Sequence, residues 1–201
     1  SLHDALPIFL ASTEPARLLA TLRSRCRLHH LAPPPESYAI SWLAREVTAS
    51  SEALLSALRL SAGSPGAALT LLQAESWAHR TDFCAALVNT LNAGDWYILL
   101  AALNHDQAAA RLHWLATLFT DALKRPYGIA HLTNPDALDL ISSIAERLSV
   151  AQIQAILGDV CHCRQQLLNV TGVNRELVLT DLILRIEHYL QPGTVLPVPH
   201  L

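Results

Sequence analysis

Apolar residues recur at every third or fourth position along most of this chain, a spacing that places them on one face of an α-helix. Short breaks rich in Gly, Pro, Asn and Ser separate these stretches, and such residues end helices and form turns. The pattern predicts helices over residues 16–23, 36–47, 51–60, 67–73, 77–91, 95–103, 106–124, 134–148, 150–169 and 173–190. Connections this short imply antiparallel neighbours in a helical bundle.

Two short stretches near the start depart from the helical pattern. Residues 9–12 form an apolar run, and Glu14 shortly after it is biased towards an extended conformation because Pro15 follows. We expect a strand over 9–12 and a second short strand over 27–31. Because two strands alone are not stable in water, they would be the remnant of a larger sheet.

Pro33-Pro34-Pro35 is the clearest linker in the chain. Three prolines fix their φ angles and cannot lie inside a helix, so they form a stiff spacer. Of the three short helices that follow, the second has Ser51 as its expected cap, and the third opens with Ser64 and Pro65. The expected divisions are 9–32 for the first part, 33–75 for the linker and three helices, and 76–201 for the bundle.

Composition agrees with a mainly α fold. Apolar residues make up 51% of the chain and aromatic residues only 5%, so the apolar content is mostly Ala and Leu, which favour helix. A charged fraction of 15% is low for an isolated domain, and it indicates that partners cover part of the surface. The formal net charge of -3 argues against a polyanion binder.

The cysteines and the apolar runs bear on the compartment. Cys26, Cys84, Cys161 and Cys163 follow neither a disulfide framework nor a Cys-x-x-Cys zinc spacing, and reduced thiols are typical of cytosolic proteins. No apolar run reaches the ~20 residues that cross a bilayer, and residues 1–10 have no basic start typical of a secretory signal. We therefore expect a cytoplasmic protein without membrane contact.

Residues 1–8 read as the translation of a common sequencing-adapter oligonucleotide. We expect them to be an adapter-derived scar that takes no part in the fold. On this interpretation the natural amino-terminal portion of the protein is missing, and its carboxy terminus is natural.

Three arginines gather in Arg23-Ser24-Arg25-Cys26-Arg27, with no carboxylate close to them in sequence. Arginine stays charged and presents a planar fork of donors that fits phosphate. Two interpretations follow: a solvated basic edge, or an arginine finger that completes a nucleotide site on a neighbouring chain.

Ser24-Arg25-Cys26, preceded by Phe9-Leu10-Ala11-Ser12-Thr13-Glu14-Pro15, resembles the clamp-loader branch of the AAA+ ATPases, and the resemblance runs from Phe9 to Leu201. It implies the remnant of an AAA+ core, a three-helix lid, and a helical collar through which subunits assemble into a ring. It also implies that Arg25, flanked by Ser24 and Cys26, acts in trans as the arginine finger.

The lid departs from its ATP-binding relatives at one informative position. In those relatives the third helix opens Gly-Ser-x-Arg-Asp-Ala-Leu and its arginine contacts phosphates, whereas residues 63–69 here read Gly-Ser-Pro-Gly-Ala-Ala-Leu, with Gly66 in place of the arginine. No Gly-x-x-x-x-Gly-Lys-Ser/Thr phosphate loop is present either. We expect a subunit that binds no cofactor and hydrolyses nothing itself.

Two other groups of residues have possible chemical roles. Cys161-His162-Cys163 resembles a metal cluster, but neighbouring residues on a helix project about 100° apart and cannot all face one ion, so we expect no metal site. On the last helix, Arg175 and Glu176 could pair across a subunit boundary, and Arg185 with Asp181 at i,i+4 is the expected spacing of a local solvated pair.

The resemblance implies a stator subunit of the clamp loader of bacterial DNA polymerase III. Arg25 would stabilise charge on the ATP of an adjacent tau/gamma subunit during phosphoryl transfer. The collar would assemble with tau/gamma and delta, and the whole complex would place the sliding clamp on primer-template DNA. The alternatives are an all-helical adaptor with no role at an ATP site, and a nucleic-acid-binding helical domain, against which the net negative charge argues.

Overall fold

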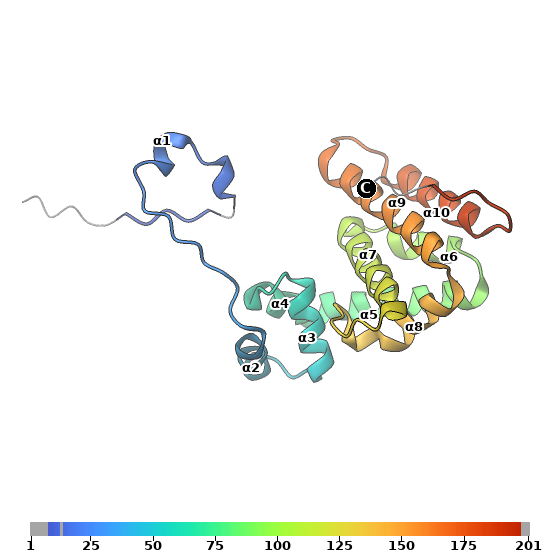
Figure 1. Ribbon diagram of the computed structural model, residues 1–201, viewed down its shortest axis with the longest axis horizontal. Coiled ribbons are helices and arrows are strands. Elements are labelled where there is room, and N and C mark those ends of the chain that lie inside the picture. The colour runs from blue at the N-terminus through green and yellow to red at the C-terminus, as the bar shows by residue number, and fades with distance from the viewer. Residues whose placement is uncertain (1–7, 13, 198–201) are drawn as a thin grey trace, which may run out of the picture. The chain divides into compact units, whose positions relative to one another are not determined.

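A computed structural model of the protein describes residues 8–12 and 14–197, and within them it is mainly α-helical, as predicted (Figure 1). The chain divides into two compact units, with the boundary in the sequence between Pro33 and Pro34. The α-helices are α1 Ala20–Arg23, α2 Glu36–Glu46, α3 Ser51–Leu60, α4 Pro65–Leu72, α5 Ala74–Ala93, α6 Tyr97–Leu103, α7 Ala108–Lys124, α8 Leu138–Arg147, α9 Val150–Asn169 and α10 Arg175–Leu190. Three 3-10 turns, η1 Pro15–Arg17, η2 Arg125–Tyr127 and η3 Pro135–Ala137, complete the elements of the described chain.

The first unit differs from its prediction. Residues 9–12 and 27–31 form no strand, and the single helix expected over 16–23 is replaced by η1 and α1, with Leu18 extended between them. Leu18 is partly covered, and every other described residue of the unit is exposed. A strand needs a partner for its backbone hydrogen bonds and a buried face for its side chains, and this segment has neither. The expected scar at residues 1–8 lies outside the described residues, apart from Ile8.

Helices α2, α3 and α4 form the three-helix unit, which has a small apolar core of its own. Ser50, one residue before the predicted cap, accepts a hydrogen bond from the backbone of Ala53 at the start of α3. Ser64 caps α4 and Pro65 opens it, as expected. The core residues are Ala39, Leu43, Ala53, Leu54, Ala57, Leu58, Ala68 and Leu72.

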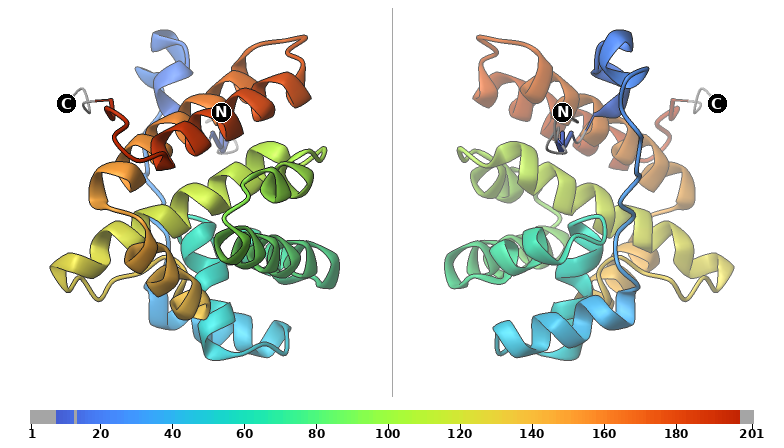
Figure 2. Two further views of the ribbon diagram at one scale, coloured as in Figure 1. Left: turned by 90° about the vertical axis from the view of Figure 1, so that its right-hand side faces the viewer. Right: turned by 90° about the vertical axis from the view of Figure 1, so that its left-hand side faces the viewer.

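Helices α5 to α10 form the C-terminal bundle around a second, larger core. Helix α7 packs on α9, and α9 packs on α10; Figure 2 shows α9 and α10 running side by side with α7 alongside them. Leu115, Leu118 and Phe119 of α7 are fully buried, so this helix supplies the centre of the core. In the described part of the chain, no single helix has both the length and the apolarity of a membrane-crossing segment.

The bundle helices end close to the predicted positions, because their stop signals act locally. Gly94 adopts a left-handed conformation with φ 69° at the end of α5, which glycine does without strain. The largest shifts are at helix starts: α5 begins three residues before the predicted 77, and a 3-10 turn precedes α8. Ser149 and Gln152 form a reciprocal capping box at the start of α9, which confirms Ser149 as its cap.

Replacing Ser149 with Ala removes the acceptor for the Gln152 backbone N–H, and we expect the free energy of unfolding to fall by about 1 kcal/mol. The matched variant Ser149→Asp keeps a capping oxygen and should stay within about 0.5 kcal/mol of the parent. Urea denaturation followed by circular dichroism measures both. Equal losses in the two variants would show that the cap contributes nothing.

Candidate functional site

The Ser-Arg-Cys segment follows directly on α1. Ser24 ends the helix, and its hydroxyl donates to the carbonyl of Thr21 at 3.2 Å. The backbone N–H of Arg25 donates to the carbonyl of Leu22, also at 3.2 Å, which holds Arg25 in a tight turn. Ser24, Arg25 and Cys26 are all exposed.

The charge of Arg25 is not neutralised by any carboxylate in the described chain. Among the described residues of this unit, Arg17 pairs with Glu14 at 2.9 Å, and no ion pair between described residues involves Arg25. Arg23 and Arg27 on either side are also exposed and add like charge. The segment therefore presents guanidinium donors to solvent, in the form that binds an anion bidentately.

Gly66 lies in the first turn of α4 and is exposed. A Cβ built on Gly66 meets nothing within 4 Å, so packing does not require glycine here. The position that would carry a phosphate-binding arginine in ATP-binding relatives thus has room for a side chain but has none.

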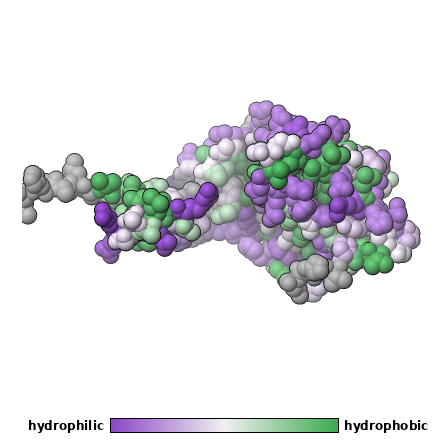
Figure 3. Space-filling model, turned by 90° about the horizontal axis from the view of Figure 1, so that it is seen from above, coloured by the Kyte–Doolittle hydropathy of each residue, from purple (hydrophilic) through white to green (hydrophobic). Residues whose placement is uncertain are grey.

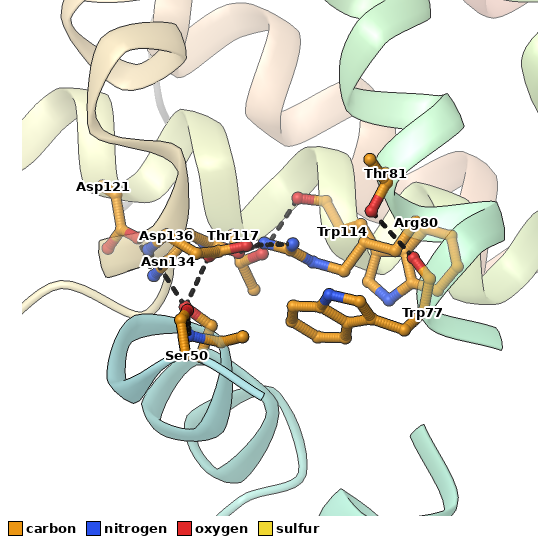
Figure 4. A network of polar contacts seen from close by, with 11 residues as sticks. Ser50, Trp77, Arg80, Thr81, Trp114, Thr117, Asp121, Asn134 and Asp136 are labelled. Carbon is orange, nitrogen blue, oxygen red and sulfur yellow. Dashed lines mark hydrogen bonds and ion pairs between the residues drawn. The ribbon is translucent and has the colours of Figure 1, made fainter. Parts of the chain in front are cut away.

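A buried polar junction, which the sequence did not predict, connects the three-helix unit to the C-terminal bundle (Figure 4). Arg80 of α5 is only 2% exposed, and its guanidinium binds both carboxylate oxygens of Asp136. The same guanidinium donates to Oδ1 of Asn134 at 2.8 Å. Its Cζ lies 4.7 Å from the centre of the Trp77 ring, a cation–π contact. Ser56 of α3 donates to Asp136, a hydrogen bond from the three-helix unit to the C-terminal bundle. We call these five residues the Arg80 junction.

A second set of contacts fixes the backbone from which Asn134 and Asp136 project. Asp121 of α7 is completely buried and accepts from the backbone N–H groups of Thr133 and Asn134 at 3.0 and 2.8 Å. Lys124 donates to the same carboxylate at 2.8 Å, so the buried charge is paired. The loop before α8 is therefore held in one position when Arg80 binds to it.

Arg59 at the end of α3 adds a third link to this loop. It binds Glu36 of α2 through two hydrogen bonds, of 2.7 and 3.0 Å, and donates to the carbonyl of Leu132. The guanidinium of Arg59 lowers the pKa of Glu36 below its usual value. Two arginines thus connect α2, α3 and α5 to the segment before α8.

The other candidates from the sequence have local explanations. Cys161 is exposed while Cys163 is buried, and burial with nearby Asp181 raises the pKa of Cys163 to about 11, so its thiol keeps its proton. No cluster of three or more metal-ligating His, Cys, Asp or Glu side chains exists within residues 8–12 and 14–197.

Both arginines of α10 are engaged within the chain. Arg175 binds Asp106 at 2.9 Å and Asn104 at 3.0 Å, so its guanidinium is already occupied on the chain's own surface. The cross-subunit pairing considered for Arg175 would have to compete with these contacts. The predicted local pair of Arg185 with Asp181 is confirmed at 2.8 Å.

Two family models match this chain, in adjoining stretches. The model described as "DNA polymerase III, delta subunit, C terminal" matches residues 74–188, more than half of the chain. The model described as "DNA polymerase III subunit delta', AAA+ ATPase lid domain" matches residues 34–73, which contain α2, α3 and α4.

The chain belongs to the family defined by the C-terminal region of the DNA polymerase III delta subunit. Its resemblance to the clamp-loader branch is thereby confirmed, and the three-helix unit matches the lid-domain model of the delta' subunit. A DNA polymerase III subunit delta' from Escherichia coli is 68% identical over 96% of this chain and 58% of its own length. A DNA polymerase III subunit delta' from Yersinia pestis is 43% identical over 94% of the chain and 57% of its own length. The chain therefore spans less than two thirds of these delta' relatives.

In this family member, the Arg80 junction should contribute strongly to stability. Arg80→Ala leaves the Asp136 carboxylate without its cation; because Arg80 is buried while the Asp136 side chain is 16% exposed, we expect a loss of about 2–3 kcal/mol. Arg45→Ala, at an exposed position on α2, is the matched control and should change stability by less than about 0.5 kcal/mol. Chemical denaturation measures both.

In the double variant Arg80→Ala/Asp136→Ala no uncompensated carboxylate remains, so the loss should be smaller than the sum of the single losses. A loss of less than about 1 kcal/mol in Arg80→Ala, typical of an exposed pair, would contradict a structural role for the junction.

Because of His113, we expect the free energy of unfolding to depend on pH. Burial, and then the charge of Arg164, lower the pKa of His113 on α7, so the folded chain favours the neutral imidazole. The unfolded chain takes up that proton near pH 6.5, so the free energy of unfolding falls as the pH drops below this value, by at most about 1.4 kcal/mol per pH unit.

His113→Gln should flatten the fall in stability between pH 7 and pH 5, and His162→Gln, at an exposed position on α9, should not. Denaturant unfolding at three pH values provides the comparison. Parallel pH profiles for His113→Gln and the parent would rule out this contribution.

Proposed function

We propose that this chain is part of a non-hydrolysing clamp-loader subunit that donates Arg25 to the ATP site of an adjacent tau/gamma subunit. The observation that carries the proposal is an exposed arginine within a Ser-Arg-Cys segment whose charge no described carboxylate neutralises. Where negative charge develops during phosphoryl transfer, a positioned guanidinium stabilises it. Ser24 and Cys26 flank Arg25, and Ser24 holds the turn through its bond to Thr21.

The lid supports the absence of hydrolysis by this subunit. At Gly66 it has no cation that could bind a phosphate, although the site has room for one. A subunit that donates Arg25 to a neighbour but has no phosphate-binding arginine in its own lid would take part in catalysis only at the neighbour's site.

Assembly is the role we propose for the C-terminal bundle, which would act as the collar. Several large apolar side chains of α9, α10 and the turn between them are exposed, among them Leu168 at 56%, Val170 at 54%, Leu177 at 68% and Leu184 at 49%. Figure 3 looks onto this end of the molecule and shows apolar surface between hydrophilic residues. Burial of such surface would hold the chain to tau/gamma and delta. The assembled cytoplasmic complex would load the sliding clamp on primed DNA.

The decisive variant is Arg25→Ala in the intact subunit, reconstituted with tau/gamma and delta. Turnover of ATP at the neighbouring site should fall by about a thousandfold or more, whereas size-exclusion chromatography should show normal assembly. Arg25→Lys should not restore the rate, because an ammonium group cannot reproduce the guanidinium fork.

Arg23→Ala is the matched control, since it removes a neighbouring exposed cation from the same segment. It should leave turnover close to normal. Unchanged turnover in Arg25→Ala would instead favour the second candidate, an all-helical adaptor, in which Arg25 is only a solvated charge.

A further inference from the structure

An open groove of about 660 Å³ runs between the start of α3, the middle of α5 and the start of α8. Its size is that of a site for a few side chains or a short segment. All three of its walls belong to the unit that begins at Pro34. The Arg80 junction forms part of its lining, through Arg80 and Asp136.

The groove is lined by both apolar and acidic side chains. Val88 of α5 is 39% exposed and Leu138 of α8 is 47% exposed, and Ala85 and Ala137 lie beside them in the lining. The carboxylates of Glu52 and Asp139 also line it, and both residues are exposed. Exposed apolar side chains and carboxylates in one groove can attract a ligand in two ways, by burial of apolar surface and by charge.

These two carboxylates have no cation of their own among the ion pairs of the described chain. The single guanidinium that lines the groove belongs to Arg80, and Asp136 and Asn134 already occupy it. Glu52 and Asp139 each stand in the first turn of a helix, where the backbone dipole favours negative charge. Ser51 donates a hydrogen bond to Glu52 at 2.9 Å, but neither carboxylate is paired with a cation in the described chain, so both are available to a cation from outside.

We propose that this groove binds an apolar segment bearing arginine or lysine, supplied by a neighbouring subunit of the assembly. The apolar part of the segment would cover Val88 and Leu138, and its basic group would lie beside Glu52 and Asp139. The inference rests on the proposed function, since it takes the partner from that assembly. It adds a contact surface at the boundary of lid and bundle, distinct from the exposed apolar side chains of α9 and α10.

Cys84 provides a native reporter, because its partly exposed side chain lines the groove. Substituting Cys26→Ser and Cys161→Ser in the intact protein removes the two exposed thiols, and Cys163 is buried. Maleimide labelling of Cys84 would be timed with this variant by itself and then with purified tau/gamma and delta added. The proposal predicts labelling at least about tenfold slower in the complex.

Charge reversal tests the chemistry of the contact. Glu52→Lys/Asp139→Lys should weaken assembly about tenfold, because two attractive charge pairs become repulsive, and it should restore fast labelling of Cys84. The matched control is Glu46→Lys/Glu75→Lys, two exposed carboxylates outside the groove lining, which should change neither result.

Each outcome has a separate meaning. A complex that forms normally while Cys84 is labelled at its original rate overturns the groove contact and leaves the proposed function standing. Failure to form a complex at all overturns the proposed function, and the groove contact with it. Protection of Cys84 that grows with concentration when no partner is added would identify a second copy as the occupant, which also contradicts the proposal.

Discussion

The three-helix unit and the C-terminal bundle are joined by the interactions that compensate the buried charge of Arg80. A guanidinium that is 2% exposed is stable only when charge and hydrogen bonds compensate for the lost water. Asp136 supplies the charge, Asn134 a further acceptor, and the ring of Trp77 covers the cation. Because Trp77 also packs against the core of the three-helix unit, the same contact joins the two cores.

This junction has a consequence for the proposed function. If the C-terminal bundle fixes the chain within an assembly, a firm connection to the bundle also fixes the lid. Asp121 holds the backbone of Asn134, and Arg59 holds that of Leu132, so the loop that receives Arg80 is itself braced. The stiff Pro33-Pro34-Pro35 spacer follows the segment that carries Arg25. In the proposed role, the bundle and the lid hold the chain in the assembly, and the segment that carries Arg25 precedes them in the sequence.

The helices could be predicted from the sequence because their signals are local. Apolar spacing marked each face, and Ser64, Ser149 and Gly94 marked ends within a few residues. The strands expected over 9–12 and 27–31 were wrong, because a strand depends on partners that local sequence does not supply. The Arg80 junction could not be predicted from the sequence for a related reason. Arg80 and Asp136 are 56 residues apart in the chain. Asn134-Pro135-Asp136 has the residue types of an ordinary helix start. The one available signal was an arginine three residues from both Trp77 and Phe83, on an otherwise apolar face of α5.

Native-state hydrogen exchange, read by mass spectrometry, tests most directly whether the junction makes the lid and the bundle one body. In the parent chain the protected amides of α2 to α4 should exchange with the same free energy as those of α7 and α9, through a single cooperative opening. In Arg80→Ala the amides of α2 to α4 should become exchangeable at lower free energy while those of α7 and α9 remain protected. Separate opening of the three-helix unit in the parent chain would contradict the account.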